Sequence, residues 1–229
     1  MCPSLNPLDT LHLQLRLEGK SLVGIDRLRQ VEIVPDEETP LMLLAQLVDQ
    51  EIVVYYDEVL QPELYAELVA QIHDISFPII NPLLGFLKTQ TISFEVGHYK
   101  TYIFPPRFAD SAITDVACCS KHDIKIQAFG FDSFAEQFYA IERDGKIVSA
   151  CASTRENELC GEAWVFTETE HRNLGFAQKV VSAWAHGLIS KSKVPFYSHK
   201  IDNLASANLA KRLELQPVFE EIVISYMNV

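Results

Sequence analysis

The sequence predicts an α/β fold in which a mixed sheet occupies the second part of the chain, behind a mostly helical N-terminal region. The dipeptide Asp144-Gly145 joins two alternating apolar segments, and such a dipeptide favours a two-residue β-hairpin. Further along, a long amphipathic helix separates two strands, which are therefore expected to run parallel. Hydrophobic residues make up 48% of the 229 residues and charged residues 22%, a balance typical of a folded soluble protein.

The first 88 residues are expected to form a region of their own, rich in helix. Pro40 favours a helix start, and the leucines after it fall on one side of such a helix. The run Ile52–Tyr56 is compatible with a buried strand or with a continuation of that helix. The other expected elements are a loop with an acidic patch over 31–40, a helix from Pro40 with Leu41, Leu43, Leu44 and Leu47 on one side, a helix over Gln61–Ile75, and one or two turns over Leu83–Lys88.

A change of pattern near Thr89 predicts a second region over 89–229. Its first part is expected to hold two strands, Thr91–Glu95 and His98–Phe104, around a turn at Gly97. The elements expected next are a helix over Asp110–Cys119, a strand over Ile124–Phe129 and a short helix or turn over Phe131–Phe134.

The pattern is strongest from residue 137 onward. Gln137–Arg143 and Lys146–Thr154 form the hairpin, and Gly161–Thr167 is a third strand. Apolar positions then recur every 3.6 residues, which predicts a helix. The elements after the third strand are this helix over Leu174–Ile189, a strand over Val194–Ser198, a helix capped by Asn203 and ending near Leu213, and a last strand over Val218–Tyr226.

The charge of the chain disfavours nucleic acid as a partner. The formal net charge is −12, and counting along the sequence gives −9 for residues 1–90 and −3 for residues 91–229. A surface of this sign repels phosphate backbones and tolerates a cationic substrate such as an amine. The five cysteines lack metal-ligand spacing, no signal peptide or membrane span is visible, and a cytoplasmic protein without a metal is expected.

One segment has the features of an anion-binding site. It runs from Thr167 to Ala177 and contains the end of a strand, a polar turn and the start of a helix. A helix N-terminus presents free backbone N–H groups and a partial positive charge, so a pyrophosphate fits there. Gly175 and Ala177 keep side chains away from the phosphates, and Arg172 adds a planar cationic donor.

This segment resembles the cofactor motif of the GNAT family of N-acetyltransferases, written Q/R-x-x-G-x-G/A. Arg172, Gly175 and Ala177 take its three defined places, and the strand GEAWVFT before it is similar to the family strand. Pro195–Ser198 and Asn203–Ser206 look like the next strand and helix start. The resemblance covers about residues 131–226.

The resemblance implies a GNAT-like sheet whose central strands splay apart around acetyl-CoA. Backbone groups of the first splayed strand would pair with the pantetheine arm, and the amides of the turn would hold the pyrophosphate. Asn203 and Ser206 would border the thioester. The implied cofactor-binding residues are Val165, Phe166, Thr167, Arg172, Asn173, Leu174, Gly175, Phe176, Ala177, Asn203 and Ser206.

Acetyl transfer to an amine requires a neutral amine, because a lysine-like amine has a pKa of about 10.4 and is charged at neutral pH. Glu162 is the first candidate for a general base, since glutamate in this strand has that role in some family members. His199, just past the next strand, is the second. Many members also carry a tyrosine in the following helix, which acts as general acid for the leaving thiolate. This chain has Ala210 near that place, and Tyr197 and Tyr226 are the nearby phenols.

The sequence therefore predicts an acyl-CoA-dependent N-acetyltransferase that acts on a small amine, an amino acid or a peptide. Two alternatives stay open. The absent tyrosine favours a non-catalytic CoA-binding regulatory module, and the acidic N-terminal region favours an interaction protein whose function lies in residues 1–88. A homodimer also stays open.

Overall fold

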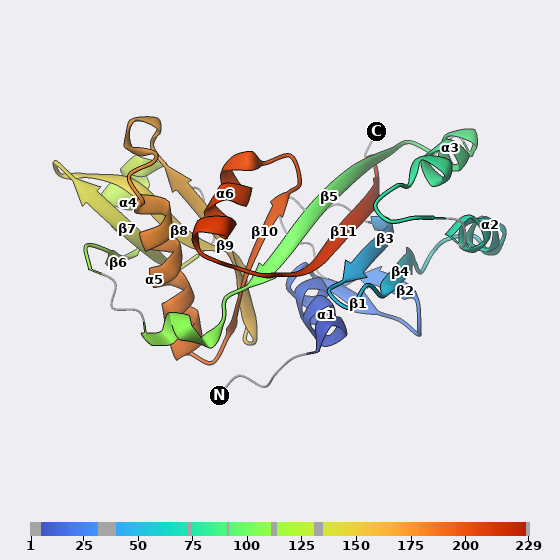
Figure 1. Ribbon diagram of the computed structural model, residues 1–229, viewed down its shortest axis with the longest axis horizontal. Helices are drawn as coiled ribbons and strands as arrows, with labels where there is room; N and C mark the ends of the chain where they lie inside the picture. Colours follow the sequence, from blue (N-terminus) through green and yellow to red (C-terminus); the bar gives the residue numbers. More distant parts are fainter. Residues whose placement is uncertain are drawn as a thin grey trace.

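One mixed sheet runs through the protein from end to end (Figure 1). The computed structural model describes residues 6–31, 40–72, 75–90, 92–110, 114–130 and 135–227. Within these residues the sheet has 11 strands in the order β1-β2-β4-β3-β11-β5-β10-β9-β8-β7-β6. The strands are β1 (Lys20–Leu22), β2 (Arg27–Gln30), β3 (Pro40–Leu47), β4 (Ile52–Asp57), β5 (Phe94–Ile103), β6 (Ala117–Ser120), β7 (Gln137–Arg143), β8 (Lys146–Glu156), β9 (Cys160–Thr167), β10 (Val194–Lys200) and β11 (Pro217–Tyr226).

The helices lie at the ends of this sheet and over both of its faces. They are α1 (Pro7–Leu17), α2 (Pro62–Ile72), α3 (Asn81–Thr89), α4 (Ile124–Phe129), α5 (Phe176–Ser190) and α6 (Leu204–Arg212), with short 3₁₀ helices η1 (Pro106–Asp110) and η2 (Thr169–His171). None of the helices in the described ranges combines the length and the apolar composition that a membrane span requires.

The mixed sheet and the elements after residue 137 confirm the prediction. Asp144 and Gly145 both have positive φ, at 50° and 80°, as a tight hairpin between β7 and β8 requires. Asn203 caps α6, because its side-chain oxygen accepts the N–H of Ser206. The helix expected from Leu174 begins two residues later, because Gly175 adopts the left-handed conformation at φ 79°.

The segment Pro40–Leu47 is a strand, so the helix expected there is wrong. In β3 every residue except Gln46 is buried, because β4 and β11 flank the strand and both faces of the sheet are covered. A strand buried on both faces shows a continuous apolar run, which also satisfies a helical period. Ile52–Tyr56, left open between strand and helix, is β4.

The N-terminal region contains α1, α2 and α3, and strands β1 to β4 accompany these helices. Helix α2 confirms the helix expected over Gln61–Ile75, and α3 confirms the turns expected over Leu83–Lys88. The loop expected over 31–40 lies almost entirely outside the described residues.

Two strands were expected around Gly97, and the structure has the single strand β5. Gly97 lies within this strand, where the ring of Tyr99 covers it. A Cβ at Gly97 would lie 2.3 Å from the Tyr99 ring, so glycine here makes room for an aromatic side chain rather than a turn.

Two more expectations between residues 110 and 134 are wrong, and one falls outside the described residues. The described end of the segment Asp110–Cys119 enters strand β6 and is not helical. Ile124–Phe129, expected as a strand, is helix α4. Asp123 caps it by accepting the N–H of Lys125 at 2.8 Å, and Gly130 ends it at φ 69°. The turn expected over Phe131–Phe134 is outside the described residues.

Strand β5 links the two parts of the chain. It lies between β10 and β11, and β11 in turn pairs with β3 of the N-terminal region. The sheet is therefore continuous across the boundary expected near residue 88, and the division into 1–88 and 89–229 stays a proposal.

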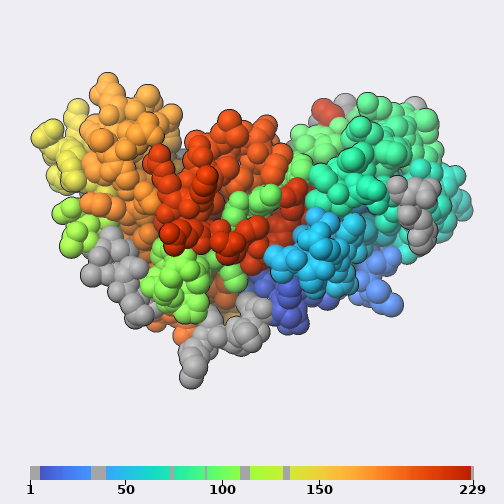
Figure 2. Space-filling view, viewed as in Figure 1, coloured from blue at the N-terminus to red at the C-terminus, as the bar shows by residue number. Residues whose placement is uncertain are grey.

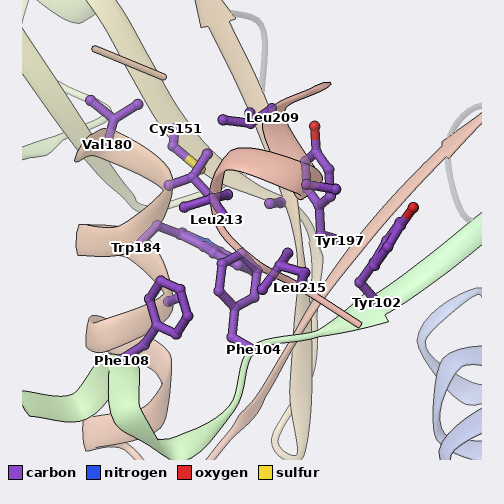
Figure 3. Packing of buried hydrophobic residues seen from close by; sticks show 14 of the residues in the cluster. Tyr102, Phe104, Phe108, Cys151, Val180, Trp184, Tyr197, Leu209, Leu213 and Leu215 are labelled. Atoms are coloured by element: carbon purple, nitrogen blue, oxygen red, sulfur yellow. The ribbon is translucent and has the colours of Figure 1, made fainter. Parts of the chain in front are cut away.

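Helices α5 and α6 cover one face of the sheet, and α1 lies on the other. On the α5–α6 face, Trp184 packs with Phe104, Phe108, Leu213 and Leu215 (Figure 3). The indole N–H of Trp184 donates to the Ser153 hydroxyl at 3.0 Å. On the other face, Leu17 of α1 packs against Cys160 and Phe196. The four described cysteines, Cys118, Cys119, Cys151 and Cys160, are free thiols.

Candidate functional site

The two parallel strands β9 and β10 separate after only three paired residues. Val194–Phe196 pairs with Cys160–Glu162, and there the pairing ends. Strand β9 continues to Thr167 along β8, while β10 continues to Lys200 along β5. The strands therefore form a fork that is closed at Glu162 and open toward Thr167 (Figure 1).

The backbone of β9 turns polar groups that do not pair with β10 toward the fork. The N–H of Glu168 donates to the carbonyl of Val148 at 2.9 Å on the β8 side. The backbone N–H and C=O groups of successive strand residues point alternately to the two neighbouring strands. The backbone groups of Phe166 therefore point to β8, and those of Val165 and Thr167 point to the fork. Phe166 thus offers the fork no backbone group, and the residue is 43% exposed.

The turn after β9 leads into a helix start without a side-chain cap. Asn173 and Gly175 adopt the left-handed conformation, at φ 64° and 79°. Helix α5 begins at Phe176, and in the part of the chain that the structure describes no side chain caps its first turn. The N–H groups of Phe176 and Ala177 are therefore free donors at the positive end of the helix, which favours a bound anion.

Arg172 and Leu174 belong to the surface of this turn. The Nε of Arg172 donates to the Thr167 carbonyl at 3.2 Å, so the guanidinium lies against the end of β9. Both residues are exposed. The turn therefore places a cation beside the uncapped helix start.

The other arm of the fork leads to Asn203 and Ser206. The side chain of Asn203 accepts the Ser206 N–H at 3.1 Å, and the Tyr197 hydroxyl donates to the Ser206 carbonyl at 3.4 Å. The first turn of α6 is thus fixed to β10 through Tyr197. Ala210, near the place where many members of the resembled family carry a tyrosine, is buried in the core below this turn.

Replacing Asn203 with alanine is expected to lower the free energy of unfolding by about 1 kcal/mol, because the cap of α6 is lost. Asn203→Asp keeps an oxygen acceptor and is expected to lose less. Urea denaturation of both variants checks this, and equal losses would contradict the capping role.

Glu162 is buried on the α1 face, at the closed end of the fork. Its Oε2 lies 3.0 Å from Nη1 of Arg155. Burial raises the pKa of Glu162, while the charge of Arg155 and a hydrogen bond from Ser198 oppose that rise. The carboxyl group therefore has a higher proton affinity than an exposed glutamate.

His199 lies on the opposite face of β10 from Glu162. Its Nδ1 is 2.8 Å from the Lys200 carbonyl, which can only accept, so Nδ1 carries the proton in the neutral ring. Its Nε2 then accepts the hydroxyl hydrogen of Tyr102 at 3.3 Å. The structure does not bring the two candidate bases together.

Two tyrosines near the fork could not be assigned from the motif. Tyr102 comes from β5, far outside the motif, and Tyr197 projects from β10 on the same face (Figure 3). Burial raises the pKa of Tyr197 to about 12, so its phenol stays protonated at neutral pH. Tyr226, the other phenol considered, packs beside the core of the N-terminal region and pairs with Phe94.

No group of three or more His, Cys, Asp or Glu side chains within the described ranges could hold a metal ion. The fork between two parallel strands, with an uncapped helix start beside it, defines the candidate site. Residues 129–220 match the model of a family described as GNAT acetyltransferase. The C-terminal part of the chain is therefore similar to a GNAT acetyltransferase domain.

One of three similar solved structures supports the fold, and the other two are similar at lower TM-scores. A GNAT-family acetyltransferase from Colwellia psychrerythraea aligns with a TM-score of 0.50 and 12% identity over 79% of each chain. A putative GNAT-family acetyltransferase from Novosphingobium aromaticivorans has a TM-score of 0.46 and 16% identity, over 59% of this chain and 66% of that one, just under two thirds. A tandem GNAT protein from the clavulanic acid biosynthesis pathway has a TM-score of 0.46 and 10% identity over 98% of each chain. Among curated proteins no match was found.

Proposed function

We propose that this protein transfers an acetyl group from acetyl-CoA to a primary amine by direct attack. The observation that carries the proposal is the fork between β9 and β10, with an uncapped helix start at its open end. The thioester arm would lie along Val165 and Thr167, and the pyrophosphate would bind the N–H groups of Phe176 and Ala177. Arg172 would add positive charge, with Asn173 and Leu174 shaping the turn. Phe166 would contribute its side chain, and Asn203 and Ser206 would border the acetyl end.

The reaction needs a base, an oxyanion donor and a stable leaving group. The amine nitrogen attacks the thioester carbon, the C–S bond breaks, and coenzyme A leaves as a thiolate. Glu162, or else His199, would accept the proton that the amine loses. The Val165 N–H, which faces the fork, would donate to the oxyanion.

Titration with acetyl-CoA and measurement of thiol release test this proposal. Acetyl-CoA should raise the melting temperature, and a panel of small amines, amino acids and peptides should include one that drives thiol release. Absence of stabilisation at millimolar acetyl-CoA would overturn the proposal. Desulfo-CoA, which lacks the sulfur, serves as a control for binding without transfer.

A regulatory CoA-binding module is the second candidate. Ala210, which replaces the family tyrosine, favours it. The two functions differ in one measurement, because a module would bind acetyl-CoA and release no thiol with any amine. A cytoplasmic location is also part of the proposal, and the free thiols of the described cysteines support a reducing compartment.

A further inference from the structure

A group of buried and half-buried polar side chains joins the end of α1 to the closed end of the fork. We call it the α1–β9 cluster, and its members are Gln14, Glu18, Lys20, Arg155, Glu162 and Ser198. The first three come from the N-terminal region, and the others come from β8, β9 and β10. The N-terminal region thus contacts the candidate base directly.

Two carboxylates share one guanidinium in this cluster. Nη1 of Arg155 lies 3.0 Å from Glu162 and 3.7 Å from Glu18. The second oxygen of Glu18 lies 2.7 Å from Nζ of Lys20, and Gln14 donates to the first at 3.1 Å. Glu18 and Glu162 are each 6% exposed, so little water screens these charges.

We propose that Glu18 is a positioning residue for Glu162, and that it acts through Arg155, whose guanidinium lies within reach of both carboxylates. The inference rests on the proposed function, in which Glu162 is the general base. It assigns a part of the transfer site to the N-terminal region. The charge of Glu18 weakens the effect that the Arg155 guanidinium has on the carboxylate of Glu162.

The physical reason is that a base tightly paired with a guanidinium is a poor proton acceptor. A second carboxylate draws part of that cation's charge away and so preserves the basicity of Glu162. Burial raises the pKa of Glu162 most, Arg155 lowers it, and Glu18 raises it again. Among the charged groups, Arg155 and Glu18 contribute most to its titration.

Glu18 itself remains ionised at neutral pH. Burial alone would raise its pKa, but Lys20, Arg155 and the hydrogen bonds from Lys20 and Gln14 together lower it. The negative charge of Glu18 is therefore fixed over the range in which Glu162 titrates.

A purely structural role is a weaker explanation of the cluster. Glu18, Lys20 and Glu162 are buried and Arg155 is half-buried. Burying charged side chains is expensive, and replacing a buried ion pair with apolar residues is often neutral or stabilising. Clusters of perturbed titratable groups gather at functional sites. This one lies where β9 leaves β10, which is where the proposed function needs a base.

Glu18→Gln tests the inference through the pH dependence of kcat/KM for amine acetylation. The acidic limb of the profile should move to lower pH, because Arg155 then pairs with Glu162 alone. Activity at neutral pH should fall, since the base is weaker, while acetyl-CoA affinity should stay within about twofold. An unmoved acidic limb would overturn the inference.

Two further variants complete the experiment. Glu18→Gln combined with Lys20→Met removes the same charge without leaving a buried ammonium, so the test survives if the single variant does not fold. Glu156→Gln is the matched control, because Glu156 lies next to Arg155 on β8 but pairs with Lys193. This variant should leave the acidic limb of the pH profile unchanged. If the wild-type protein releases no thiol with any amine, the proposed function fails, and the inference with it. A wild-type protein that is active with an unmoved limb overturns the inference alone.

Discussion

Replacing Glu162 with glutamine is expected to lower kcat for amine acetylation by about 10²- to 10⁴-fold, the range over which a positioned general base contributes. Glutamine keeps the volume of the side chain and one acceptor oxygen but cannot accept the proton. Acetyl-CoA affinity should change little, because the cofactor residues lie further along the fork. Initial rates of thiol release check the loss in kcat, and a separate binding titration checks the affinity for acetyl-CoA.

The control for this prediction is His199→Gln, on the opposite face of β10. If Glu162 is the base, this variant should lose less than about tenfold in kcat. The reverse ranking would assign the base role to His199, and Tyr102→Phe should then also lower kcat, because the Tyr102 hydroxyl contacts His199 at 3.3 Å. Equal and small losses in all three variants would contradict both assignments.

The pH profile of the wild-type protein gives an independent check. A base must be ionised to act, so activity should fall as the pH drops through the pKa of Glu162. Burial raises that pKa, so the acidic limb should lie above the range of an exposed glutamate. In Glu162→Gln this limb should disappear from the residual activity.

Local signals in the sequence predicted the motif half of the fold well. Asp144-Gly145, Asn203 and Gly175 each determine a turn or a cap through their own backbone or side chain, so neighbouring residues suffice to assign them. The uncapped helix start next to β9 follows from the same kind of local pattern.

Long-range packing accounts for what the sequence did not reveal. Strand β3 is buried on both faces, which erased the alternation that marks a strand. Helix α4 is short, yet Asp123 and Gly130 carried its cap signals and could have identified it. Tyr102 and Glu18 reach the fork only because β5 lies beside β10 and α1 covers β9. No local pattern encodes these contacts.

The turn at Gly175 gives the second large effect. Gly175→Ala is expected to weaken acetyl-CoA binding by one to two orders of magnitude, about 1.4–2.8 kcal/mol. Gly175 has φ 79°, and an alanine there strains the backbone whose conformation directs the N–H groups of Phe176 and Ala177 to one point. The added Cβ has open space around it, with its nearest neighbour, the Gln178 side chain, at 3.9 Å. The effect therefore comes from the backbone and not from a steric clash.

Gly145→Ala is the matched control for that change. Gly145 has φ 80° and open space around it, so alanine there strains the backbone as much, but in the β7–β8 hairpin. Both variants should lose about 1–2 kcal/mol of stability, and only Gly175→Ala should lose acetyl-CoA affinity in calorimetric titration. An equal loss of affinity in both would mean that stability, rather than the geometry of the turn, limits binding. Unchanged affinity in Gly175→Ala would mean that the pyrophosphate does not bind at the start of α5. The proposed orientation of acetyl-CoA along the fork would then be wrong as well.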